Sequence, residues 1–111
     1  MRRLIVDIET DGLLEDATRV WCIGIYDPDR HVRALFHDDP EIQPRTGSIE
    51  DARRVLERTD RLFVMHNGAC FDVPMLERLL GWDLSKIRLW DTLLVSERRA
   101  SGSPGAPART R

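Results

Sequence analysis

The chain is predicted to fold as a single α/β domain on a mixed sheet, an antiparallel three-strand meander plus parallel strands flanked by helices. Its first 37 residues hold three β-rich segments joined by turn signals, which is typical of a meander. Later, short apolar runs alternate with helical patterns, which indicates parallel strands joined by right-handed crossovers. A length of 111 residues favours one domain.

The first half of the chain carries the meander and one helix. The expected strands lie at residues 3–9, 19–27 and 31–37. Ser48-Ile49-Glu50-Asp51 resembles a capping box and opens a helix that is expected to reach about Arg58.

The second half repeats a strand-then-helix pattern. Leu62–Met65 is a continuous apolar run, which predicts a strand buried on both faces. A helix is expected from about Asp72 to Leu80, where Gly81 ends it. A further strand and helix, and then a tail rich in Gly, Pro and Ser that is expected to be disordered, are placed at residues 87–90, 91–99 and 100–111.

Asp7 and Glu9 lie within the apolar, β-branched run of the first strand. Side chains in a strand alternate between faces, so these two carboxylates are expected to point the same way. Like charges this close repel unless a cation lies between them, and a divalent metal ion fits that role. The alternative is a strand end that frays into a polar loop at Asp11-Gly12.

Charge and composition argue against several classes of protein. The net charge is −2, but residues 1–96 carry −5 and residues 97–111 carry +3, so the body is not a basic nucleic-acid clamp. No apolar run approaches the ~20 residues that span a bilayer, and no membrane partner is expected. Cys22 and Cys70 lack metal-like or redox spacing and fit reduced thiols. These features predict a cytoplasmic protein.

A second unusual segment runs from Val64 to Leu76. A buried strand ends at His66, the polar turn Asn67-Gly68 follows, and a helix begins near Asp72. In open α/β sheets, ligands bind at the carboxyl ends of strands, which would place Asp72 in a binding crevice. The alternative for Asp72 is a helix N-cap, a common role for aspartate.

The two segments together resemble the DEDD 3′–5′ exonucleases of the ribonuclease-H-like fold. The likeness is carried by Asp7-Ile8-Glu9-Thr10 and, about sixty residues later, by an Asn-Gly turn followed by Phe71-Asp72. Leu89–Leu94 also looks like the family's Asp-Thr-Leu helix start. The pattern is most similar to the proofreading domain of phage-type, A-family DNA polymerases.

This resemblance implies a site with two divalent ions, Mg²⁺ or Mn²⁺, about 4 Å apart. Asp7, Glu9 and Asp72 would be the metal ligands and catalytic carboxylates. The main chain around Ile8 and Thr10 would contact the terminal nucleotide, and Asn67 would bind the substrate backbone or orient Asp72. Phe71 would stack on a base or pack beneath the site. The implied partners are a single-stranded DNA 3′ end and a polymerase domain in the full-length protein.

The family's third motif, a Tyr or His followed by a fourth Asp, is not found after Asp72. The remaining aspartates are Asp83 and Asp91, and neither has a Tyr or His four or five residues before it. We therefore expect a partial domain at residues 1–99, truncated before the last helices and with reduced or no activity. The alternative function is a non-catalytic module that binds nucleic acid or a partner through a degenerate nuclease site. Action on RNA is a third possibility.

Overall fold

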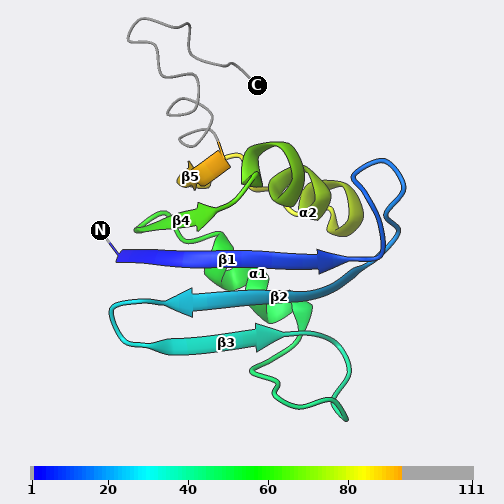
Figure 1. Cartoon of the computed structure of the whole chain (residues 1–111), viewed down its shortest axis with the longest axis horizontal. Helices are drawn as coiled ribbons and strands as arrows, with labels where there is room; N and C mark the ends of the chain where they lie inside the picture. Colours follow the sequence, from blue (N-terminus) through cyan, green and yellow to red (C-terminus); the bar gives the residue numbers. More distant parts are fainter. Residues whose placement is uncertain (1, 94–111) are drawn as a thin grey trace, which may run out of the picture.

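The computed structural model describes residues 2–93, which form a five-stranded sheet in the order β3-β2-β1-β4-β5 (Figure 1). The first three strands are an antiparallel meander, and the last two run parallel to the first. Their bounds are β1 Arg2–Thr10, β2 Val20–Asp27, β3 Val32–Phe36, β4 Arg61–Met65 and β5 Leu89–Asp91. The predicted mixed sheet is confirmed.

Two helices complete this part of the fold. Helix α1 (Ile49–Leu56) begins at a full capping box, in which Ser48 and Asp51 each bond the other's backbone N–H. Helix α2 (Val73–Leu80) ends at Gly81, which adopts a left-handed φ of 68°. A five-residue π-helical turn, η1 (Gly68–Asp72), precedes α2 and was not predicted.

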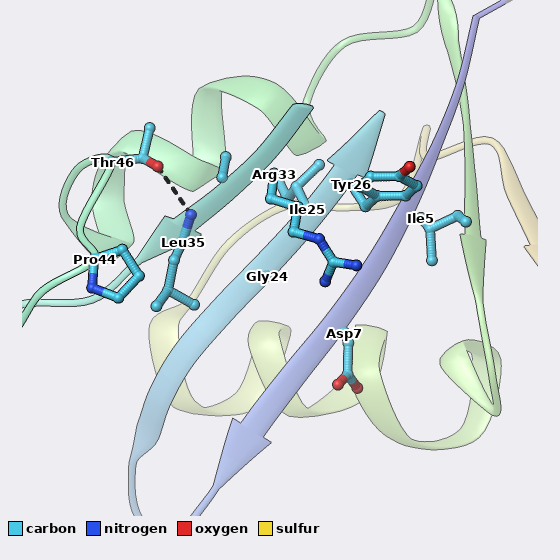
Figure 2. Close-up of a pocket in the computed structure, with 10 residues that line it drawn as sticks. Ile5, Asp7, Gly24, Ile25, Tyr26, Arg33, Leu35, Pro44 and Thr46 are labelled. Carbon is cyan, nitrogen blue, oxygen red and sulfur yellow. Dashed lines mark hydrogen bonds between the residues drawn. The ribbon is translucent and has the colours of Figure 1, made fainter. Parts of the chain in front are cut away.

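The hydrophobic core lies on one face of the sheet. On β1, the side chains of Leu4, Val6 and Ile8 are buried, whereas Ile5 on the other face is 44% exposed. Both α1 and α2 lie behind the sheet in the view of Figure 2, on the buried face. The opposite face carries neither helix, so β4 is fully buried only at Phe63 and Met65. The prediction that this strand is buried on both faces is therefore wrong within residues 2–93.

The strand register creates an opening at one edge of the sheet. The last pair between β1 and β4 is Ile5 with Val64, so β1 extends past the end of β4. On its other side β1 stays paired with β2 as far as Thr10, with an irregularity after Glu9. Residues 6–10 therefore project beyond β4, beside the turn through which the chain leaves that strand.

Two predictions fall on residues that the structure does not describe. The predicted helix at 91–99 lies outside the described residues after position 93, and so does the expected disordered tail at 100–111. Within residues 2–93, neither helix has the length and apolar character that crossing a bilayer requires.

Candidate active site

Asp7 and Glu9 project from the same, exposed face of β1, as their spacing predicts. Glu9 is paired across the ladder with Cys22 of β2. The pKa of the Cys22 thiol is raised, first by its burial and then by the negative charges of Glu9 and Asp7. This electrostatic influence of both acids on one thiol follows from their shared face. The alternative of a frayed strand end at these positions is not observed.

Asp72 is the last residue of η1 and is only 5% exposed. Although it stands in the N-cap position of α2, its backbone is already helical (φ −62°, ψ −51°), and its side chain makes no capping hydrogen bond. A capping side chain normally requires an extended backbone. The N-cap interpretation of this aspartate therefore does not hold, and its buried carboxylate is left for another role.

Three other acids, Asp7, Glu9 and Asp91, act electrostatically on the carboxylate of Asp72. Burial first, and then the charges of Asp7, Asp91 and Glu9 in that order, together raise the pKa of Asp72 to about 7. Burial and these three charges all disfavour the charged form. A buried carboxylate among other carboxylates is an unfavourable arrangement that a bound cation would relieve.

Asp91 is the acid that sequence reasoning did not place in the site. It ends β5 and is only 6% exposed. Its Oδ1 accepts hydrogen bonds from the backbone N–H groups of Asn67 (2.9 Å) and Leu93 (3.0 Å), and its Oδ2 accepts one from Ala69 (3.1 Å). The available signal was its position at the end of a predicted strand, at the edge where Asp72 also lies.

The four predicted substrate-binding residues occupy different environments. Ile8 points into the core and is 5% exposed, so only its main chain can face a ligand. The hydroxyl of Thr10 donates to the carbonyl of Gly12 (2.7 Å). Asn67 adopts a left-handed conformation (φ 62°) at the start of η1. Phe71 is half-buried and packs against the core, which favours the packing role over base stacking.

His66, at the end of β4, is tied to the strand beside it. Its Nδ1 lies 3.0 Å from the hydroxyl oxygen of Thr92, the residue after β5. The side chain of His66 is exposed.

The uncovered face of the sheet is hollowed next to Asp7. A cavity of about 530 Å³ extends across β1, β2 and β3, and Asp7 lies at its border (Figure 2). The guanidinium of Arg33 stacks over the ring of Tyr26 at 5.1 Å within it. Apolar side chains that include Ile5, Leu35 and Pro44 line the rest.

The described residues hold no preformed metal cage. Between positions 2 and 93, no three His, Cys, Asp or Glu side chains are close enough together to hold an ion as they stand. The donor chemistry nevertheless fits a hard divalent cation, because the acids are oxygen ligands and one of them is buried without a capping bond.

Comparison with known proteins bears on the family and the fold. A family model described as the RNase H superfamily matches residues 4–100. The fold is similar to that of a nuclease solved in its apo form, with a TM-score of 0.67 and 16% identity over 92% of this chain. It is also similar to the family B DNA polymerase of the hyperthermophilic archaeon Pyrobaculum calidifontis, with a TM-score of 0.60 and 18% identity over 87% of this chain. The chain spans 45% of that nuclease and 16% of that polymerase. No curated protein matches in sequence.

Proposed function

Because the chain belongs to the RNase H superfamily, we propose that it is a metal-dependent nuclease domain, and more narrowly a 3′–5′ exonuclease that acts on single-stranded DNA ends. One observation carries the proposal. Asp72 is buried at the end of the turn that follows β4, and the charges of Asp7, Asp91 and Glu9 act on its carboxylate. We further propose that a DNA polymerase domain accompanies this one in the full-length protein.

Asp7, Glu9 and Asp72 would hold two divalent ions, Mg²⁺ or Mn²⁺. These ions would supply Lewis-acid stabilisation of the phosphodiester and lower the pKa of the attacking water. The carboxylates do not form a closed cage in the described residues, so ion binding would have to draw them together. Asp7 and Glu9 have exposed side chains on a strand end that projects past β4, which leaves them room to adjust.

The chain's own residues would position the substrate around these acids. The backbone of residues 8–10 projects beyond β4, and it would contact the terminal nucleotide. Asn67 would orient the substrate backbone from the start of η1. Phe71 would support the site from beneath, since it packs against the core.

The test is a nuclease assay with the full chain and single-stranded DNA labelled at its 5′ end, in the presence of Mn²⁺. The expected result is stepwise shortening that chelation abolishes and that Asp7→Ala or Asp72→Asn reduces by at least about 100-fold. Asp83→Ala is the matched control, because Asp83 is an exposed carboxylate that bonds only within its own loop, to the N–H of Ser85. This control variant should retain the wild-type rate.

The pattern of products separates the possible activities. Laddering from a 5′ label indicates removal from the 3′ end, whereas immediate release of the label indicates the opposite polarity. Cleavage at internal positions would contradict the exonuclease proposal, but it would still support nuclease activity. A parallel RNA substrate tests the sugar preference. If neither the DNA nor the RNA substrate is cleaved with Mg²⁺ or Mn²⁺, the proposal of a catalytic domain fails.

A second candidate, a non-catalytic module that binds nucleic acid or a partner, is favoured by one observation: no three acids are preassembled for an ion in the part of the chain that the structure describes. Binding of single-stranded DNA that is unchanged by EDTA and by Asp72→Ala would support it. Binding that requires Mn²⁺ would count against it.

A further inference from the structure

We propose that Asp91 is a positioning residue, which fixes the turn that carries Asp72 rather than binding a metal ion itself. The effect on metal-ion binding that we expect from this role depends on the proposed function. Its structural part, the control of the turn, stands on the hydrogen bonds of Asp91 alone.

The carboxylate of Asp91 is oriented by the turn that follows β4. Asn67 and Ala69 are the residues on either side of Gly68, where η1 begins, and their N–H groups donate to different oxygens of Asp91. Leu93 donates to Oδ1 as well. Hydrogen bonds to a charged acceptor are stronger than neutral ones, so this clamp is well suited to hold a short, irregular segment.

The same turn determines where Asp72 lies. Gly68 and Asp72 are the two ends of η1, and the N–H of Val73 bonds back to the carbonyl of Gly68. The side chain of Asp72 makes no capping hydrogen bond, so its placement follows from the backbone of this turn. Fixing the first residues of η1 therefore fixes the direction in which Asp72 points.

The packing around Gly68 limits other ways to hold this turn. A Cβ atom at position 68 would lie 2.6 Å from the Cβ of Met65, closer than real contacts allow. Next to it, Asp91 is paired in register with Met65, and Thr92 contacts His66. The end of β5 thus braces the end of β4 at consecutive positions.

A direct role in metal binding is less consistent with these contacts. Three backbone N–H groups already occupy most of the acceptor sites of the Asp91 carboxylate, which leaves one free site, on Oδ2. Groups that orient metal ligands without touching the ion commonly change metal affinity by about 10- to 100-fold. This is the size of effect that we expect for Asp91.

The first arm of the test uses the metal-free protein. Amide hydrogen exchange is followed by NMR in wild type, Asp91→Ala, Asp91→Asn and the matched control Asp83→Ala. In Asp91→Ala, the amides of Asn67 and Ala69 should exchange about tenfold faster or more, while core amides of β1 such as Val6 change much less. Equal acceleration throughout the sheet would overturn the proposal, because it would mean a general loss of stability.

The second arm measures Mn²⁺ affinity by calorimetric titration of the same variants. Asp91→Ala should weaken binding about tenfold or more without changing the number of ions bound. Asp91→Asn should restore part of the affinity, because its amide oxygen can still accept from Asn67 and Leu93.

Two results in this second arm would overturn the proposal. An Asp91→Asn variant as impaired as Asp91→Ala would make Asp91 a ligand. If Asp91→Ala loosens the turn but leaves the Mn²⁺ affinity unchanged, Asp91 does not influence metal binding through Asp72. If wild type binds no Mn²⁺, the proposed nuclease function fails, while the exchange experiment still decides whether Asp91 holds the turn.

Discussion

Asp72 is a buried carboxylate with acids as its electrostatic neighbours, and its protonation state links stability to pH. In the folded chain it keeps its proton up to about pH 7, whereas its ordinary pKa is 3.8. Between these values the folded state binds the extra proton, so the contribution of Asp72 to stability is complete below about pH 4 and is lost as pH rises through about 7.

Asp72→Asn should therefore stabilise the metal-free protein at pH 8, because it removes a buried charge and keeps the shape of the side chain. After allowance for solvent screening, we expect a gain on the order of 1 kcal/mol, or about 4–8 °C in Tm. At pH 5, where Asp72 of the folded protein is still mostly protonated, the gain should be less than half as large.

Thermal unfolding in EDTA across pH 5–8 measures this difference, with Asp83→Asn as the control. A stability difference that does not change with pH would contradict a raised pKa for Asp72.

The candidate site could be predicted residue by residue only in part. Asp7 and Glu9 were predictable because a strand's two-residue period places them on one face. Asp72 required its place after a buried strand and the family resemblance. Asp91 was not placed, because its role depends on contacts with a turn 24 residues earlier. Its position after a predicted strand distinguishes it from Asp83, but that position alone does not reveal the turn that it contacts.

At the scale of secondary-structure elements, local sequence patterns predict the strands and the two helices, but they do not predict η1. Helix α1 begins where Ser48 and Asp51 predict it, although it ends at Leu56 rather than near Arg58. The π-helical turn has five residues, too few to establish a period, and it depends on tight packing at Gly68. A sequence pattern cannot express that packing, because it involves Met65 and Leu89 from two strands.

Gly68→Ala should destabilise the protein by about 1–3 kcal/mol, because the new methyl group would overlap Met65. Gly24→Ala is the matched control: its Cβ would meet only the carbonyl oxygen of Asp7, at an ordinary 3.7 Å. Denaturant unfolding of both variants measures the difference. Equal stability of the two variants would show that η1 adapts freely.

At the scale of the whole molecule, one group of arginines lies at the opposite end of β1 from Glu9. Near its start, Arg2 pairs with Asp27 at 2.5 Å, and the positive charges of Arg58 and Arg2 add to burial in lowering the pKa of Arg61. Glu9 lies seven residues further along, roughly 20 Å away. That distance exceeds the screening length of about 8 Å at physiological salt, so these arginines cannot neutralise the acidic edge. A polyanionic substrate at that edge would gain no neutralising charge from this group of arginines.

The central claim is that the acidic edge of the sheet collects divalent cations. Its most direct test is paramagnetic broadening of backbone NMR signals by substoichiometric Mn²⁺. We predict that signals around Asp7, Glu9 and Asp72 disappear first, and that the double variant Asp7→Asn/Asp72→Asn loses this selectivity. Broadening that begins near Asp27 and Asp60 instead, or that affects all signals equally, would contradict the account.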